Sequence, residues 1–295
     1  MPTATALPRM VPGLSTAPVH HIAHHKVVDL EGGLFAMGSA YFDNATPHWV
    51  ELSPFSLGNT AVIESQYRAV MGRPGNDKAP DDHPVTEVSW YDADRYLATL
   101  NKSKGTRLGL PTEAEWEFAA RGRVVDIRKV MKVEGIELGD FVDFVDGRFE
   151  NFVTAVALGE RIFTDPTEDK FQQILRTSQP LYGWRVHETP SGRLDTTQAY
   201  FDQEKTAPAD WGSANGYGLK GMTGGVWEWL GDWYAKNAYG DASNKDPIGP
   251  KEGKLKVLRG GSWYSDDPDN LRVAYRDRGY PGARSGIGGF RVAVR

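Results

Sequence analysis

The chain has 295 residues, of which 40% are hydrophobic and 25% charged, enough for one large or two modest globular domains with a real core. Its net charge of −5 disfavours nucleic acid and anionic membranes as partners, and the absence of cysteine excludes disulfides, thiolate metal sites and cysteine nucleophiles. No apolar run approaches the ~18 residues of a membrane span, and no signal-peptide segment is evident, so we expect a cytoplasmic location by default.

Residues 1–25 are rich in Pro, Thr and Ala and end in a histidine-rich segment from His20 to His25. Histidines four apart on a helix could face one metal ion, but the prolines disfavour a helix and no carboxylate or cysteine accompanies the histidines. We therefore interpret residues 1–25 as a flexible N-terminal tail and place the folded body at residues 26–295.

The first part of the body predicts short strands and one helix. Two strands are expected at residues 27–30 and 33–38, around a turn at 31–32, and a third at 48–52, where apolar and polar residues alternate. Apolar residues then recur at helical spacing between Thr60 and Met71, where we expect a helix.

Two further helices have clear start signals. Ser89 and Asp92 form one capping pattern, ahead of apolar residues at helical spacing up to residue 100, and Thr112 and Glu115 form a second. The acidic residues around Glu115, at 113, 115 and 117, could instead be catalytic carboxylates. Helix-start chemistry explains the first two, so we favour the capping role.

The C-terminal stretch, residues 259–295, has framework-like ends and a surface-like middle. An apolar run at 255–258 leads through two glycines to Trp263, and residues 289–294 alternate as a final half-buried strand would. Between these ends Tyr, Asp, Ser, Asn, Gly and Arg predominate, which is the mixture typical of contact surfaces. The alternative is a glycine-rich solvated loop folded over the core.

Seven segments in order carry a resemblance to a known family. They are GLFAMG at 33–38, HPVTEVSW at 83–90, LPTEAEWEFAARG at 110–122, NGYGL at 215–219, GGVWEW at 224–229, RGGSW at 259–263 and GFR at 289–291. Together they closely resemble the formylglycine-generating enzyme (sulfatase-modifying factor) family. The resemblance implies an α+β fold of the C-type lectin type, with little regular secondary structure, two core helices and small antiparallel sheets. It is more specific for the fold than for the function.

Residues 123–206 do not fit the spacing of that family, so we interpret them as an insertion that forms a subdomain beside the core. Within them, residues 140–147 alternate as a hairpin strand would, and a helix start is expected near residue 165.

The resemblance also implies which family chemistry this chain lacks. The catalytic enzymes of the family bind copper through two cysteines shortly after the RGGS motif, at positions that correspond here to Ser265 and Asn270. A hydroxyl and an amide cannot replace two thiolates as soft-metal ligands, so formylglycine generation is not expected. Relatives that form sulfoxides use a His-x3-His-x-Glu iron motif, and the histidines at 20–25 lack that glutamate.

Calcium is a further expectation that the resemblance raises, because family members commonly bind it near the GNVWEW motif. Here Gly225 replaces the asparagine and removes a side-chain oxygen. Backbone carbonyls at Gly225 and the carboxylate of Glu228 remain candidate ligands for such a hard cation. No cofactor is required by the function that we favour.

The C-terminal stretch also resembles the variable region of proteins that are diversified by retroelements, in which adenines of a template are copied with errors into the 3′ end of a gene. Asn codons of the AAC type then become codons for Asn, Asp, Ser, Tyr, Gly, Ile and similar residues. The candidate ligand-binding positions hold that set: Tyr264, Ser265, Asp266, Asp267, Asp269, Asn270, Tyr275, Asp277, Gly279, Tyr280, Gly282, Ser285, Gly286 and Ile287. Framework residues alternate with them, including Leu271, Arg272, Arg276, Arg278 and Arg284.

We therefore expect a non-catalytic module that binds a protein or another macromolecule through a diversified C-terminal surface. Tyrosines would anchor the partner, and the aspartates and arginines would tune polar contacts unless the arginines serve the framework. The alternative is a family enzyme, an oxidase or maturation enzyme, with a non-cysteine site near Trp263, Glu228 and Arg276. That alternative predicts a concave pocket with convergent polar groups, whereas the binding module predicts an exposed, rather flat face.

Overall fold

The computed structural model describes residues 17–39, 42–46, 48–122, 199–241 and 245–295. The predicted insertion therefore lies outside the described residues up to position 198, and so do its expected hairpin strand and helix. Within the described residues, no helix has the length and apolar character needed to cross a membrane.

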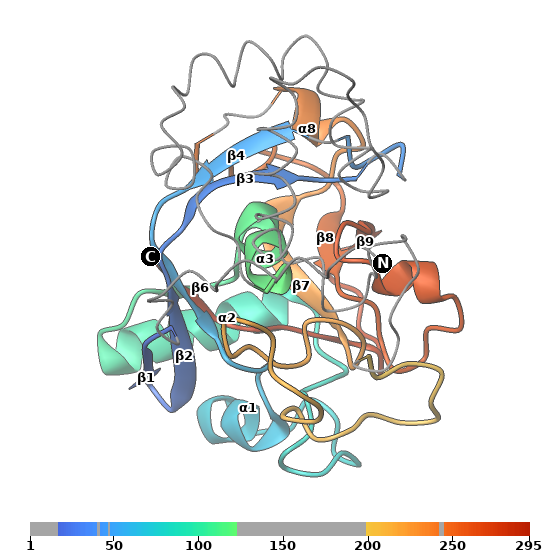
Figure 1. Ribbon diagram of the computed structural model, residues 1–295. Helices are drawn as coiled ribbons and strands as arrows, with labels where there is room; N and C mark the ends of the chain where they lie inside the picture. The colour runs from blue at the N-terminus through green and yellow to red at the C-terminus, as the bar shows by residue number, and fades with distance from the viewer. Residues whose placement is uncertain (1–16, 40–41, 47, 123–198, 242–244) are drawn as a thin grey trace, which may run out of the picture.

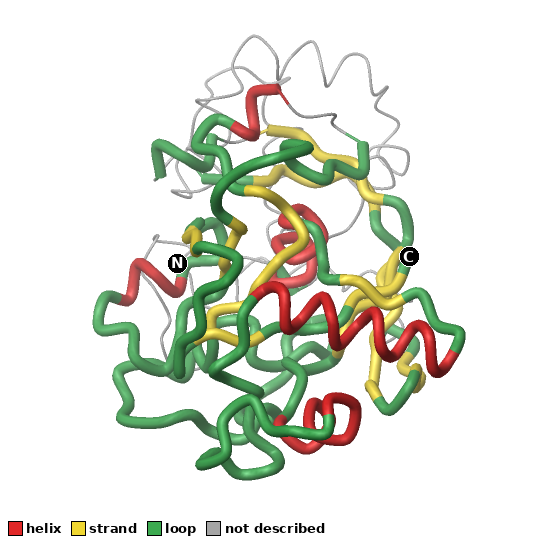
Figure 2. The backbone as a smooth tube through the Cα atoms, turned by 180° about the vertical axis from the view of Figure 1, so that it is seen from behind, coloured by secondary structure: helices red, strands yellow, loops and turns green. Residues whose placement is uncertain are grey.

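The strands in the described ranges form three small sheets (Figure 1). The first has the order β1 (Val19–Ile22), β2 (His25–Leu30), β5 (Phe55–Gly58), β11 (Ala293–Val294) and β6 (Leu108–Gly109). The second has the order β10 (Gly288–Gly289), β7 (Trp227–Trp233), β8 (Lys256–Arg259) and β9 (Asp277–Gly279), and the third pairs β3 (Gly33–Met37) with β4 (His48–Leu52). Among these named strands of the described part of the chain, pairing is antiparallel except between β10 and β7. Loops dominate the rest of the backbone, as Figure 2 shows, which confirms the predicted α+β fold with little regular structure.

The helices begin where the sequence predicts caps. In α2 (Trp90–Lys104) the Ser89 hydroxyl accepts the Asp92 amide, and in α3 (Glu113–Ala120) the Thr112 hydroxyl accepts the Glu115 amide. The first helix, α1 (Glu64–Met71), begins four residues later than expected from Thr60. Two short helical turns complete the described elements, α8 (Ala238–Asp241) and the 3-10 turn η2 (Pro268–Leu271).

Helix α3 lies at the centre of the molecule, between the β3–β4 pair and β7 (Figure 1). Its apolar side chains, including Trp116 and Phe118, are buried in a cluster with Phe35 and Leu230. A second cluster joins α1 and α2 to Phe290 and Trp229. C-terminal residues belong to both clusters and so connect them.

The two strands expected around the 31–32 turn are present as β2 and β3, which belong to different sheets. Two other expectations need correction. The boundary between tail and body at residue 25 falls inside a hairpin, because β1 pairs with β2 from Val19 to Ile22. The expected final strand is split, because β10 pairs with β7 and β11 pairs with β5 and β6. Which strands pair is decided by their neighbours in the folded structure. The alternation of apolar and polar residues along the chain does not reveal those neighbours.

Gly261 offers a test of the turn that leads from β8 into the C-terminal surface. It has φ of +73°, and a Cβ there would lie 2.5 Å from Leu271 Cδ2. Gly105, at the end of α2, has a similar φ of +65° but no atom within 4 Å of an added Cβ. We expect Gly105→Ala to cost about 1–2 kcal/mol from backbone strain alone, and Gly261→Ala to cost about 1–3 kcal/mol more from overpacking.

Urea unfolding of both variants measures the difference. Equal losses of stability would contradict the close packing of Gly261 against Leu271.

Candidate binding surface

The C-terminal segment is fastened to the core by buried arginines at regular places along its length. Arg259, Arg276 and Arg291 are each at most 2% exposed. Arg276 donates to both oxygens of Glu113 at 2.7 and 2.8 Å, and Arg291 donates to both oxygens of Glu228 at 2.6 Å. Planar guanidinium groups suit such two-point contacts with carboxylates. The segment is therefore tied down before, within and after its surface-like middle.

Helix α3 supplies most of the carboxylates for these contacts. Glu117 binds Arg259 and also Arg121, which lies 2.5 Å away. Burial acts to raise the pKa of Glu117, but the two arginines lower it below its ordinary value, so the side chain stays charged. Glu115 binds Arg295 at 2.6 and 2.7 Å in addition to its capping contact with Thr112. Glu115 thus has the predicted capping role, whereas Glu113 and Glu117 bind arginines of the C-terminal segment, which the sequence did not predict.

Most candidate binding positions lie at the surface. All of them except Ser265 are exposed or half-buried, and Tyr264 and Tyr280 are 68% and 70% exposed. Some of the framework residues between them turn inward, since Leu271 and Arg276 are buried. Others, such as Arg278 and Arg284, are exposed, so the division into contact and framework residues corresponds only in part to an outer and an inner side of the segment.

Several positions differ from their expected role. Ser265 is 8% exposed, and its hydroxyl accepts the amide of Ser262, so it supports the turn. An added Cβ at Gly279 would lie 2.6 Å from Trp229, which leaves space for glycine only. Tyr275 is half-buried, with its ring against Trp227 and Phe42. These three residues belong to the framework of the surface more than to its outer side.

The arginines also divide into two groups. Arg276 is a framework residue, because its guanidinium binds Glu113 and the carbonyls of Asn44 and Ala235. Arg278 is exposed and stacks over the Tyr234 ring at 4.9 Å. Arg284 is exposed as well, and it binds Asp92.

Asp92 and Tyr91 bring helix α2 into the surface, which the sequence did not predict. Burial acts to raise the pKa of Asp92, but hydrogen bonds from Arg284 and Ser89 hold it well below its usual value, so Asp92 stays charged. Tyr91 is 51% exposed, and its amide donates to the carbonyl of Pro281. The sequence feature that could have predicted this role of Tyr91 is an aromatic residue on the solvent-exposed face of an amphipathic helix.

The predicted calcium ligands do not fit a calcium ion. Both oxygens of Glu228 accept hydrogen bonds from Arg291, and one also accepts from the Trp116 indole at 2.8 Å. The carbonyl of Gly225 accepts the Trp263 amide at 2.8 Å. A carboxylate already neutralised by a guanidinium has little charge left for a cation. Among the residues that the structure describes, no group of three or more His, Cys, Asp or Glu side chains could hold a metal ion.

The histidine-rich segment is divided between separate contacts. His25 is buried, and its Nε2 lies 2.8 Å from the Tyr96 hydroxyl. Burial, with a smaller effect of His24, lowers the pKa of His25 to about 4, so it is neutral at pH 7. His20 faces Asp29 at 3.4 Å.

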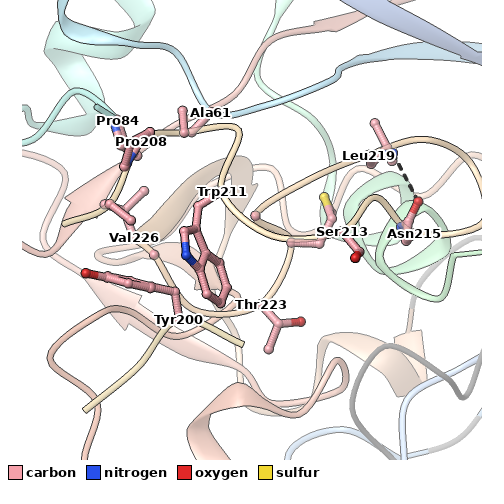
Figure 3. A pocket seen from close by; sticks show the side chains of 15 residues that line it. Ala61, Pro84, Tyr200, Pro208, Trp211, Ser213, Asn215, Leu219, Thr223 and Val226 are labelled. Atoms are coloured by element: carbon pink, nitrogen blue, oxygen red, sulfur yellow. Dashed lines mark hydrogen bonds between the residues drawn. The ribbon is translucent and has the colours of Figure 1, made fainter. Parts of the chain in front are cut away.

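The site expected for the enzyme alternative is not assembled. Glu228 and Arg276 bind different partners, and the Trp263 indole donates to the carbonyl of Gly286 at 3.0 Å. A small pocket lies elsewhere, between the rings of Tyr200 and Trp211 and residues 221–226 (Figure 3). Its lining contains no charged side chain.

A buried acid with an unusual pKa lies beneath the α3 network. Asp232 on β7 is 4% exposed, and its Oδ2 accepts the Glu113 amide at 2.9 Å. Burial and the nearby charges of Glu113 and Glu115 raise the pKa of Asp232 to about 7. Asp232 is thus an acid that folding tends to keep protonated.

Comparison with known proteins shows which family model, which related proteins and which solved structures this chain resembles. A family model, the sulfatase-modifying factor enzyme 1-like domain, matches residues 14–295. The chain is 30% identical to the formylglycine-generating enzyme of Streptomyces coelicolor over 90% of this chain and 88% of that protein. It is 32% identical to the serine/threonine-protein kinase pkn1 of Chlamydia caviae over 72% of this chain, but only 24% of the kinase.

The solved structures that share the fold include the following two. The Treponema denticola variable protein 1 superposes with a TM-score of 0.65 at 22% identity, over 95% of this chain and 99% of that one. PvdO from Pseudomonas aeruginosa superposes with a TM-score of 0.64 at 19% identity, over the same shares.

The buried pair of Arg276 and Glu113 offers a test of the anchoring network. Arg276→Gln leaves the carboxylate of Glu113 buried without its main partner, so we expect a loss of about 3–5 kcal/mol in unfolding free energy. The matched control is Arg68→Gln, because Arg68 and Asp81 form a pair with side chains 41% and 67% exposed. That change should cost less than about 1 kcal/mol. Comparable losses in urea unfolding would contradict the anchoring role.

Asp232 offers a test through pH. Between about pH 4 and pH 7 the folded protein keeps a proton on Asp232 that the unfolded chain has lost, so this group makes the protein less stable as pH rises. The effect is about 1.4 kcal/mol per pH unit at most and ends above pH 7. Asp232→Asn retains an oxygen acceptor for the Glu113 amide and removes the titration. We expect the unfolding free energy of the variant, relative to that of the native protein, to be higher at pH 8 than at pH 5. Urea unfolding of both proteins at pH 5 and at pH 8 measures this difference. A gap that does not change with pH would contradict the raised pKa.

Proposed function

The chain belongs to the sulfatase-modifying factor enzyme 1-like family, and we propose that within it this protein is a non-catalytic binding module whose C-terminal surface is diversified. The observation that carries the proposal is the set of exposed and half-buried candidate positions between Tyr264 and Ile287, in a segment held at both ends and in the middle by buried arginines. Because the backbone of this irregular run is fixed by the scaffold, little ordering entropy is lost when a partner docks.

The chemistry of the exposed side chains supports the proposal. Tyr264 and Tyr280 present rigid aromatic area, and Asp266 and Asp267 present charge close to it. Tyrosine is common among residues that dominate binding energy, and rim charges mainly tune rate and specificity. The partner is a protein or another macromolecule. The superposition on a variable protein of Treponema denticola agrees with this use of the fold.

The alternative is a family enzyme with a non-cysteine site, and the similarity to formylglycine-generating enzymes favours it. The chain has no cysteine, so two-cysteine copper chemistry is excluded. At the expected site, Ser265 supports a turn and Glu228 is neutralised by Arg291. We therefore favour binding over catalysis.

The test is to sequence the DNA around the gene and the 3′ end of the gene across a cell population. We expect a near-copy of codons 259–295 that differs only where the copy has adenine, beside a reverse-transcriptase gene. Variation should concentrate at exposed positions such as Tyr264, Asp266 and Tyr280. Selection should keep Arg276, Leu271 and Gly279 unchanged, because they are buried or have no room for a side chain. Absence of both the copy and the reverse transcriptase would contradict the proposal and favour the enzyme.

A further inference from the structure

Two arginines from distant parts of the chain share one buried carboxylate at the edge of the C-terminal surface. Arg73, in the loop that follows α1, binds Oδ1 of Asp92 at 3.1 Å, and Arg284, in the C-terminal segment, binds Oδ2 at 2.8 Å. The side chain of Asp92 is 2% exposed, whereas those of Arg73 and Arg284 are 48% and 53% exposed. The carboxylate therefore holds both guanidinium groups from the buried side and leaves about half of each arginine open to solvent.

The loop that carries Arg73 is itself fixed to the core. The buried carboxylate of Glu64 accepts the amides of Gly75 and Asn76 at 2.9 and 2.8 Å. A Cβ at Gly75 would lie 2.4 Å from the carbonyl oxygen of Thr86, so the loop packs closely against that residue. Arg73 thus projects from an ordered backbone, which reduces the entropy that a binding partner would cost.

The two arginines have more hydrogen-bond donors than one carboxylate can accept. Arg284 uses its Nε and one terminal nitrogen on Asp92. Arg73 uses one terminal nitrogen on Asp92 and makes a longer contact of 3.5 Å with the Pro74 carbonyl. Because Asp92 stays charged, the three groups together carry one positive charge in excess. Donors and charge therefore remain for a second anionic group.

A third arginine adds to this positive charge. Arg95 is exposed on α2, three positions after Asp92. Burial raises the pKa of the Tyr67 hydroxyl, whereas the charges of Arg95 and of the two arginines on Asp92 act to lower it. All three cations therefore lie near the Tyr67 ring. This edge of the surface is basic although the chain as a whole has a net charge of −5.

The basic edge is continuous with exposed aromatic residues of the binding surface. Arg284 comes directly after a turn in which the Ala283 amide donates to the Tyr280 carbonyl at 2.8 Å. An added Cβ at Gly282 would lie 4.0 Å from the ring of Tyr91, on α2. Tyr91 and Tyr280 are 51% and 70% exposed. A partner that covers these two tyrosines therefore also meets Arg284.

The charge of this edge selects the chemistry of the partner. Planar guanidinium groups suit two-point contacts with carboxylates and phosphates. The exposed Asp266 and Asp267 in the same segment would repel a polyanion, whereas a protein presents acidic and basic side chains on one surface. We propose that Arg73 and Arg284 form a constant contact of the binding surface, which binds a carboxylate side chain of a protein partner. Arg73 lies outside the diversified segment and Arg284 at one of its framework positions. This inference rests on the proposed binding function.

The experiment compares a carboxylate probe with its amide. The probes are N-acetyl-glutamate methylamide and N-acetyl-glutamine methylamide, added to the native chain at equal ionic strength. Binding is followed through the arginine Nε–H signals in proton–nitrogen NMR spectra, with Arg73→Gln and Arg284→Gln used to assign the two signals. We expect saturable shifts of both signals, with a Kd for the glutamate probe on the order of 1 mM. The glutamine probe should bind roughly 10-fold more weakly, because it lacks the charge.

The arginine variants decide whether these side chains are responsible. Arg73→Gln and Arg284→Gln should each weaken binding of the glutamate probe about 5- to 10-fold, as measured on the signal of the arginine that remains. The control Arg68→Gln removes an exposed arginine that is paired with Asp81, and it should leave the affinity unchanged. If Arg284→Gln does not fold, Arg73→Gln decides the question, because Arg73 is not part of the C-terminal segment.

Three results would overturn the inference. They are shifts that do not saturate, equal binding of the two probes, and an affinity for the glutamate probe that Arg73→Gln and Arg284→Gln leave unchanged; the last would indicate an adventitious ion only. Inorganic phosphate tests the other anion. If phosphate binds the native chain at least about 10-fold more tightly than the glutamate probe and Arg284→Gln abolishes this binding, the arginines recognise phosphate and the assigned chemistry is wrong. None of these results depends on codon variation at 264–287, so failure of this contact and failure of the diversified surface are distinguished.

Discussion

The structure depends on buried pairs between carboxylates and arginines that lie far apart in the sequence. Arg276 and Glu113 are separated by 163 positions, and Arg291 and Glu228 by 63. Each pair crosses between the C-terminal segment and the elements that precede it, and each is completely removed from water on the arginine side. A buried pair adds little net stability compared with apolar packing, but it tolerates few alternative partners. Here it determines where the segment lies against α3 and β7.

This anchoring separates the scaffold from the surface. Hydrogen bonds donated by arginines and glycine-dependent turns hold the backbone from Arg259 to Arg295, while Tyr264 and Tyr280 on its outer side are exposed. We expect substitution at such exposed positions to be tolerated, because surface changes away from buried contacts usually alter stability by less than about 0.5 kcal/mol. A framework of this kind suits a surface that changes while the fold remains.

The same scaffold accounts for the similarity to enzymes. Family membership and the solved structures show that the fold is shared, but a fold supports many functions. In this chain the carboxylates nearest the expected enzyme site are neutralised by guanidinium groups, and the chain contains no thiol. The aromatic residues at Tyr264, Tyr280 and Tyr91 are exposed instead. These exposed aromatic side chains suit the binding function that we propose.

The sequence by itself determined the capped helices at Ser89 and Thr112 and the α+β class, because caps and residue patterns are local properties. It indicated the exposure of Tyr264 and Tyr280 but not the burial of Ser265. Only the tertiary structure decided that β10 and β11 belong to different sheets, that Gly279 has no room beside Trp229, and that Glu228 binds Arg291. It also brought Tyr91 next to the surface. Each of these outcomes depends on contacts between residues distant in sequence, which no local pattern encodes.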